Sequence, residues 1–218
     1  MWLRFCSALG LVAAAQAAPD WPQFRGPSGD GRTNARGLPL TWSEKENVRW
    51  KTALPGEGWS SPVAGDGRVW LTSSLNDGHS LRALCVDVLT GKLLQDVEVF
   101  HVEAPEPINN KANTHASPTP VLDGGRLYVS YGTHGNACLD AATGKVLWRN
   151  SQLRLFHDNN GAGSSPIVYS NLFIAHCDGV DLRYIAALKR IRANWPGPRN
   201  APRKSPAVAE PTKPSLPR

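Results

Sequence analysis

The sequence of 218 residues contains one methionine, four cysteines and no apolar run of the length needed to cross a membrane. Its most apolar stretch, Leu9–Ala15, is far shorter than the roughly 20 residues of a membrane-spanning helix. Glycine and proline are plentiful by comparison, with 20 and 18 copies, and both favour turns over helices. The composition therefore argues against a membrane span and favours an all-β protein rich in turns.

The first 17 residues have the pattern of an export signal. Arg4 supplies the positive charge, Leu9–Ala15 the apolar core, and Ala15-Gln16-Ala17 the small residues of a cleavage site. We expect cleavage after Ala17. The sequence thus predicts an exported protein, periplasmic or extracellular.

Cysteine is scarce outside that segment. Once Cys6 is removed with the signal, Cys85, Cys138 and Cys177 remain, and an odd number excludes a fully paired set of disulfides. We interpret them as small buried residues, with a disulfide or a metal site as the alternative.

The strongest pattern in the chain is an internal repeat. The segment 85–92, with the sequence CVDVLTGK, returns 53 residues later as CLDAATGK at 138–145. A second block, a proline followed by two short apolar strands around a turn, begins at Pro62, Pro120 and Pro166. Short strands with a period near 50 residues are typical of β-propeller blades.

The repeated D-x-x-T-G-K motif has a simple physical interpretation. Aspartate at a strand end accepts hydrogen bonds from the following turn, threonine does so more weakly, and glycine takes the positive φ that closes a hairpin. We therefore predict a structural role in the turn for both copies of the motif: Asp87, Thr90, Gly91 and Lys92, and Asp140, Thr143, Gly144 and Lys145.

A tryptophan follows the second copy at a fixed distance. Trp148 lies three residues after Lys145, and Trp50 occupies the matching place in an earlier strand. A large flat ring there would pack between neighbouring blades. The first copy has Gln95 at this position, so we expect its contact with the next blade to be weaker.

Together these residues resemble the pyrroloquinoline-quinone (PQQ)-like propeller repeat, which carries a tryptophan-docking motif A-x-D-x-x-T-G-K-x-x-W. Residues 138–148 match it except for Cys138, and residues 85–95 match it except for Cys85 and Gln95. The WPQFRGP segment at 21–27 is similar to the start of secreted bacterial members. The resemblance extends from about residue 20 to residue 188.

The resemblance implies that PQQ and calcium are possible cofactors. A quinoprotein dehydrogenase would need a calcium site of Glu, Asn and Asp, an Arg or Lys near the quinone, and a stacking Trp. No spacing in this sequence identifies such a set, and the adjacent cysteines of quinoprotein alcohol dehydrogenases are absent. Repeats of this type also occur in proteins that bind no quinone.

The repeat divides the chain into four regions: a signal peptide at 1–17, a lead-in segment at 18–46, propeller repeats at 47–188, and a tail at 189–218. We predict a lone outer strand at 48–54, full four-stranded blades within 59–100 and 114–153, and three strands within 163–188. This is a partial propeller, with the strands of about three blades. Because propellers close with about four to eight blades, we expect a fragment of a longer propeller, or self-association through exposed blade edges.

The basic excess of the chain lies in its tail. Residues 189–218 contain eight Lys or Arg, one acidic residue and seven Pro, which is typical of a disordered segment. Its basic residues are not interleaved with aromatics, and an exported protein seldom meets nucleic acid, so we expect no nucleic-acid partner.

Three histidines are the remaining candidates for chemistry. His115 and His134 flank one predicted hairpin pair, and His157 lies in the next connection. They could form a transition-metal site, although histidines at strand ends more often hydrogen-bond to turns. No Ser-His-Asp or Cys-His pattern is present. The sequence therefore favours a non-catalytic exported module that binds a protein or polysaccharide partner, with a relative of quinoprotein dehydrogenases as the alternative.

Overall fold

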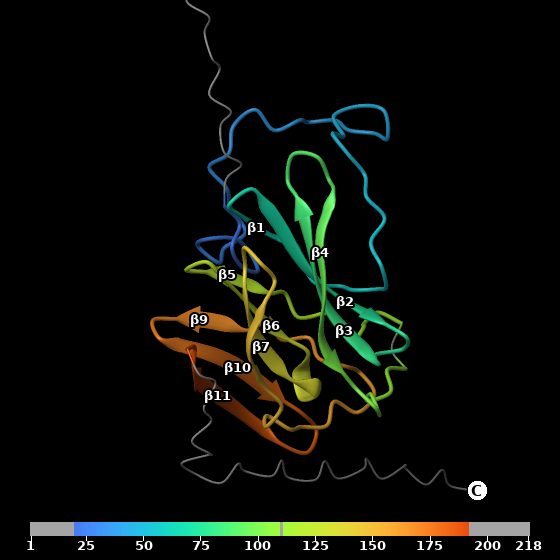
Figure 1. Cartoon of the computed structure of the whole chain (residues 1–218), viewed down its shortest axis with the longest axis vertical. Helices are drawn as coiled ribbons and strands as arrows, with labels where there is room; N and C mark the ends of the chain where they lie inside the picture. The colour runs from blue at the N-terminus through green and yellow to red at the C-terminus, as the bar shows by residue number, and fades with distance from the viewer. Residues whose placement is uncertain (1–19, 110, 192–218) are drawn as a thin grey trace, which may run out of the picture.

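The computed structural model describes residues 20–109 and 111–191, and they form an all-β fold (Figure 1). Eleven strands make three antiparallel sheets, and one three-residue 3-10 helix, η1 (Gly132–His134), lies between two of the strands. The first sheet contains β1 (Val63–Gly65), β2 (Arg68–Leu75), β3 (Ser80–Asp87) and β4 (Leu93–His101); the second contains β5 (Val121–Asp123), β6 (Arg126–Ser130), β7 (Asn136–Asp140) and β8 (Val146–Asn150); the third contains β9 (Ile167–Tyr169), β10 (Leu172–Asp178) and β11 (Arg183–Lys189).

Each sheet is a meander in which strands adjacent in sequence pair with one another. The register repeats as well, because Trp70 pairs with Cys85, Tyr128 with Cys138, and Ile174 with Ala187. Antiparallel meanders of this kind are the blades of a propeller. The predicted fold class, an all-β partial propeller, is confirmed.

The sheets stack face to face in chain order, and the core lies in two layers between them. One cluster of buried side chains lies between the first and second sheets and includes Leu81, Val99, Leu127 and Leu139. The other lies between the second and third sheets and is centred on the ring contacts of Tyr128, Trp148 and Phe173. Burial of apolar area between the sheets is the main force that holds them together.

We call the stack of three sheets the fan. The first strand of each sheet lies on the inner side of the fan. β1 contacts β5, and β5 contacts β9, although neither pair is hydrogen-bonded as one sheet. In Figure 1 these three short strands lie along one side of the stack. They occupy the position of the propeller axis.

One predicted strand is absent. Residues 48–54 are extended but have no ladder partner, and they are not a strand. Their alternation is strand-like, since Trp50, Thr52 and Leu54 are partly covered while Arg49 and Lys51 are exposed. A strand exists only as a pair, and no strand among the described residues pairs its edge with this segment.

The ends of the fold differ slightly from the predicted regions. The lead-in segment is attached to the inner strand β1 by paired backbone hydrogen bonds between Trp21 and Ala64. The last strand ends at Lys189, one residue beyond the predicted limit of the repeats. The predicted signal peptide and the tail from residue 192 lie outside the described residues. No helix among the described residues is long and apolar enough to span a membrane.

Candidate functional site

The antiparallel topology gives the fan two distinct ends. The turns within β1–β2 and β3–β4, and their equivalents in the second sheet, lie at one end, which we call the turn end. The connections between sheets, residues 102–120 and 151–166, lie at the other with the β2–β3, β6–β7 and β10–β11 turns. We call this the loop end. Functional residues of propeller-like scaffolds are usually carried by such loops.

The predicted motif residues lie at the turn end. Asp87 Oδ1 accepts hydrogen bonds from the backbone N–H of Leu89 and Thr90 and from the Thr90 hydroxyl, at 3.1, 2.7 and 2.7 Å. Asp140 receives the same three bonds from Ala142 and Thr143. These donors, with the threonine hydroxyl the largest contributor, lower the pKa of both carboxyl groups.

The glycine and lysine of each motif complete the turn. Gly91 and Gly144 both have φ of 73°, the left-handed region that favours glycine. The Lys92 and Lys145 carbonyls accept the backbone N–H of Asp87 and Asp140, each at 2.9 Å. Backbone atoms of the lysines thus close both turns.

A side chain from the segment or sheet that precedes it in the stack docks on each motif turn. The Trp50 indole N–H donates to the Val88 carbonyl at 3.1 Å, and its ring lies over Gly91, where any β-carbon would overlap it. The Gln95 amide donates to the Ala142 carbonyl at 2.8 Å. Gln95 therefore docks at the equivalent place without the bulk of an indole.

The third sheet has no motif of this kind, and Arg190 takes over part of its role. Lys189 stands where the other sheets have Asp87 and Asp140. Arg190 N–H bonds to the Asn171 carbonyl, as Val88 and Ala141 bond to glycine carbonyls. The Arg190 carbonyl accepts the Trp148 indole N–H at 2.7 Å, and its side chain donates to the Tyr128 hydroxyl at 3.0 Å and forms an ion pair with Asp123.

A cluster of histidines around one carboxylate lies at the loop end. Glu106 Oε2 contacts His157 Nδ1 at 2.6 Å, with both side chains about nine-tenths buried. His115 Nε2 contacts the Glu106 carbonyl at 2.7 Å, and the His115 and His134 rings lie 5.7 Å apart. Glu106 was not among the sequence candidates, because an isolated acidic residue in a loop gives no signal of this role.

The polar groups of this cluster contact one another and are partly buried, which limits their chemistry. Burial, followed by the neighbouring His115, lowers the pKa of His134 to about 4 from 6.5, so this ring is neutral at neutral pH. Among residues 20–109 and 111–191, no group of three or more His, Cys, Asp or Glu side chains has the geometry to hold a metal ion. The predicted proximity of the three histidines is present, and the metal site is not.

A ladder of hydroxyl groups runs along the inner side of the fan. The Ser61 N–H donates to Thr119 Oγ1, and the Thr119 N–H donates to Ser165 Oγ, both at 3.0 Å. These residues immediately precede Pro62, Pro120 and Pro166. The sequence carried a signal for this ladder, a hydroxyl residue before the proline in every repeat, but only the structure reveals the bonds between repeats.

An open cleft of about 760 Å³ lies beside this ladder. Two aromatic side chains line it while largely exposed, Trp59 at 61% and Phe24 at 52%. None of the described residues that line it is an aspartate or glutamate. Because calcium in proteins is held by several oxygen ligands that usually include carboxylates, the lining does not fit a calcium-bound quinone.

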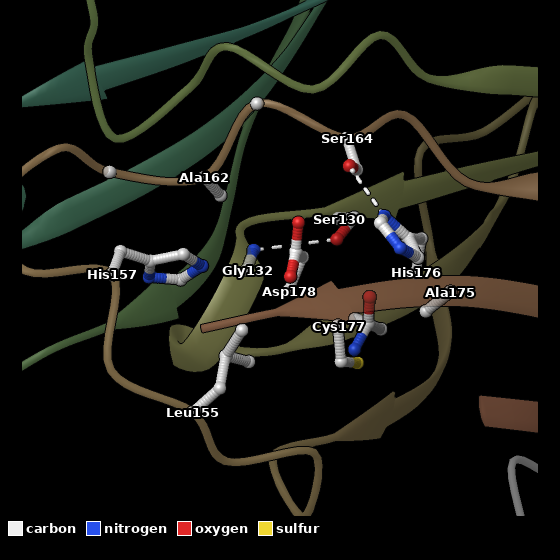
Figure 2. A pocket seen from close by; sticks show the side chains of 13 residues that line it. Ser130, Gly132, Leu155, His157, Ala162, Ser164, Ala175, His176, Cys177 and Asp178 are labelled. Carbon is white, nitrogen blue, oxygen red and sulfur yellow. Dashed lines mark hydrogen bonds between the residues drawn. The ribbon is translucent and has the colours of Figure 1, made fainter. Parts of the chain in front are cut away.

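A smaller pocket of about 230 Å³ lies between the second and third sheets (Figure 2). Ser164 Oγ and His176 Nδ1 are 3.2 Å apart there, as the dashed line in Figure 2 shows. Asp178 pairs with Arg183 at 3.1 Å, and no hydrogen bond in the described residues joins it to His176. Burial raises the pKa of the Cys177 thiol. Among the described residues, His176 of this pocket therefore has no hydrogen bond to a carboxylate, and Cys177 is not readily deprotonated.

The family model described as outer membrane protein assembly factor BamB matches residues 84–193. Comparison with curated proteins finds no significant match. Similar solved structures include quinohemoprotein alcohol dehydrogenase ADHIIG from Pseudomonas putida, at 18% identity and TM-score 0.47, covering 67% of this chain and 21% of that one. BamB from Moraxella catarrhalis is similar at 19% identity and TM-score 0.46, covering 67% of this chain and 37% of that one.

The quinohemoprotein alcohol dehydrogenase from Comamonas testosteroni is similar at 18% identity and TM-score 0.47, covering 64% of this chain and 20% of that one. The chain thus spans between 20% and 37% of the length of these three proteins. The family match covers half of the chain and contains both β7–β8 and β10–β11, where the repeated register was observed. The chain belongs to the family of PQQ-like β-propeller repeat proteins.

Proposed function

We propose that this chain is a non-catalytic propeller module that, after export, binds a protein partner in the open cleft beside the hydroxyl ladder. The observation that carries the proposal is the open cleft, in which Trp59 and Phe24 are exposed beside backbone and hydroxyl groups and no carboxylate is present among the described lining residues. Exposed aromatic side chains in a concave surface are typical anchors of protein interfaces.

The chemistry of the surrounding residues supports a binding role over a catalytic one. Glu106 is paired with His157, Asp178 with Arg183, and the ring of His134 is held neutral. An enzyme needs a group whose protonation state or nucleophilicity is free to change during the reaction. Structural partners occupy these candidates instead.

The relatives point in two directions, since one solved structure is named BamB and others are named quinohemoprotein alcohol dehydrogenases. The lining of the cleft favours the first, because a quinone held through calcium would have no carboxylate there. The export that we propose rests on the N-terminal signal pattern. N-terminal sequencing of the secreted product should begin at Ala18, and a product that retains Met1 would overturn the export proposal.

The binding role can be tested with an array of immobilised peptides in extended conformation, probed with the full chain. We expect a subset of peptides to bind, and Trp59→Ala to weaken that binding at least tenfold. Trp42→Ala is the matched control, because Trp42 is exposed at 69% but lies outside the cleft.

A titration with PQQ and Ca²⁺, followed by tryptophan fluorescence and dye-linked oxidation of ethanol, tests the enzymatic alternative. Saturable quenching with alcohol oxidation would reject the non-catalytic role. Peptide binding that is lost equally in Trp42→Ala and Trp59→Ala would reject the cleft as the binding surface.

A further inference from the structure

The fan ends on one side with an unpaired strand. β11 pairs with β10 along one edge, and no strand among the described residues pairs with its other edge. The equivalent strands of the other sheets, β3 and β7, are covered there by β4 and β8. An open row of backbone donors and acceptors is a template for a further strand.

The fan begins on its other side with a segment, residues 48–54, that belongs to no sheet. From Arg49 to Leu54 the side chains alternate between exposed and partly covered, as they do in a strand. Within the described part of the chain, the backbone of residues 48–54 makes no hydrogen bond with other backbone groups. Their side chains are nevertheless fixed, because Trp50 docks on Val88 and the Thr52 hydroxyl donates to the Gly91 carbonyl at 2.6 Å.

The docked side chains identify which strand this segment is. Gln95 of β4 and Trp148 of β8 each dock on the following sheet, at the Ala142 and Arg190 carbonyls. Trp50 docks on the first sheet in the same way. Residues 48–54 therefore stand where the fourth strand of a preceding sheet would stand, and the described residues contain no fourth strand for the third sheet.

These two elements cannot pair within one copy. The segment 48–54 lies against the face of the first sheet that is turned away from the second sheet, whereas β11 belongs to the third sheet beyond it (Figure 1). The second sheet separates them in the stacking order. Within residues 20–109 and 111–191, neither edge therefore has a partner in its own copy.

We propose that two copies of this chain close one ring, with residues 48–54 of each copy forming the fourth strand of the third sheet of the other. Each copy then contributes eleven strands and this segment, which makes six four-stranded sheets in the dimer. Six lies within the range of about four to eight blades in closed propellers. A two-fold axis repeats the same contact at both junctions between the copies and so closes the assembly.

The repeat fixes the register of the exchanged strand. Cys138 pairs with Trp148 in the second sheet, and Cys85 pairs with Gln95 in the first. The equivalent of these cysteines in the third sheet is Ala187, which pairs with Ile174 as Cys138 pairs with Tyr128. Trp50 of one copy therefore lies opposite Ala187 of the other, and Thr52 lies opposite Ile185. A small residue opposite the docking side chain is retained in all three sheets.

The exposed face of the third sheet fits the same contact. Ile167, Tyr169 and Ile185 are exposed at 55%, 72% and 69%, and the strand register places them on the face of Ala187. In the second sheet the corresponding face, with Tyr128 and Cys138, is buried against the next sheet. The first sheet of the second copy, with its docked Trp50, would cover this face in continuation of the two interfaces already formed.

The hydroxyl ladder continues across the same boundary. It runs from the Ser61 N–H to Thr119 and from the Thr119 N–H to Ser165. In the dimer the next step is from the Ser165 N–H to the Ser61 hydroxyl of the second copy. The backbone edge of β11, the exposed apolar face of the third sheet and the hydroxyl ladder are thus all completed by the same part of the second copy, residues 48–54 and the first sheet.

An engineered disulfide between the two elements tests the proposal. In Thr52→Cys/Ile185→Cys the two thiols face each other only between copies, so mild oxidation should give a covalent dimer on a non-reducing gel. The matched control is Leu94→Cys/Leu147→Cys, which places two thiols on the exposed sides of β4 and β8. We expect at least tenfold more covalent dimer from the first pair, and reduction should return it to monomer.

Sedimentation of the unmodified full chain provides a second measurement that requires no variant to fold. A dimer at micromolar concentration is expected. A monomer at all concentrations, or equal cross-linking of the two cysteine pairs, would overturn the proposal. A monomer would also be the outcome if residues after Ile191 of the same chain, or another protein, covered β11.

Discussion

At the scale of single residues, the fold depends on positions where the backbone and a neighbouring side chain are constrained together. Gly91 is the clearest case, because its φ of 73° disfavours other residues and the Trp50 ring occupies the place of a β-carbon. Gly67 has almost the same φ, 72°, with open space around it. Comparing substitutions at Gly91 and Gly67 therefore separates the cost of backbone strain from the cost of displacing the Trp50 ring.

Gly91→Ala should destabilise the protein more than Gly67→Ala. Backbone strain costs each variant about 1–2 kcal/mol, and displacement of Trp50 adds about 1–3 kcal/mol for Gly91→Ala alone. Urea unfolding followed by circular dichroism measures both. Equal losses of stability would show that Trp50 is not held over Gly91 in solution.

The buried His134 should make stability depend on pH. Its pKa is about 4 in the folded chain and about 6.5 in an unfolded one, so the unfolded state binds the additional proton between these values. The free energy of unfolding should therefore fall as the pH falls from 6.5 towards 4, and be flat with respect to this group above 6.5. His134→Gln should remove this contribution, so that the total loss of unfolding free energy between pH 6.5 and 4 is smaller by an amount on the order of 1 kcal/mol.

Urea unfolding at pH 7.5, 6 and 5 checks this expectation. His101→Gln is the matched substitution of a histidine outside the cluster, because the His101 side chain is 59% exposed. A slope that persists in His134→Gln would assign the pH dependence to other groups.

At the scale of elements, the sheets are joined by one docking side chain per interface, and these contacts are unequal. Trp148 donates its indole N–H and packs its ring against Phe173 at 5.8 Å between centroids. Gln95 donates its amide N–H, but its buried Oε1 has no hydrogen-bond partner among the described residues. The contact between the first and second sheets is therefore the less satisfied one.

Gln95→Trp should stabilise the protein by about 1–2 kcal/mol, because it removes a buried unpaired carbonyl and adds ring area. Gln95→Ala should destabilise it, since the bond to the Ala142 carbonyl is lost. Thermal unfolding of both variants measures the two effects. A Gln95→Trp variant with a lowered melting temperature would mean that the space over Gly144 does not accept an indole.

At the scale of the whole molecule, stability depends on stacking, because no sheet has a core of its own. The apolar clusters lie between the sheets, and the third sheet is attached to the second through Tyr128, Trp148 and Arg190. Arg190 matters here because it follows the last strand and still bonds back to the second sheet. The folded unit therefore extends beyond Leu188, the predicted limit of the repeats.

A chain that ends after Leu188 should be less stable than one that ends after Ile191. The shorter chain lacks the Arg190 carbonyl that accepts the Trp148 N–H, as well as the Arg190 contacts with Tyr128 and Asp123, at a cost of about 2–3 kcal/mol. Thermal unfolding of the two truncated proteins provides the comparison. Equal melting temperatures would show that the Arg190 contacts do not contribute to the stability of the folded unit.

The sequence alone was sufficient for the fold, because the information is local and repeated. Asp140, Thr143 and Gly144 specify a turn through bonds among near neighbours, and a second copy at 87–91 makes the period visible. Strand alternation around those turns then gives four-stranded blades, and Trp148 marks where one blade meets the next.

What the tertiary structure decided is everything that depends on contacts between blades. Glu106 reaches His157 across 51 positions, and neither residue carries a pattern that predicts the pair. Residues 48–54 have the alternation of a strand, yet they are not one, because a strand requires a neighbouring edge and alternation does not supply it. Which edge pairs with which, and whether a docking residue is satisfied, are set by the stacking of sheets in three dimensions.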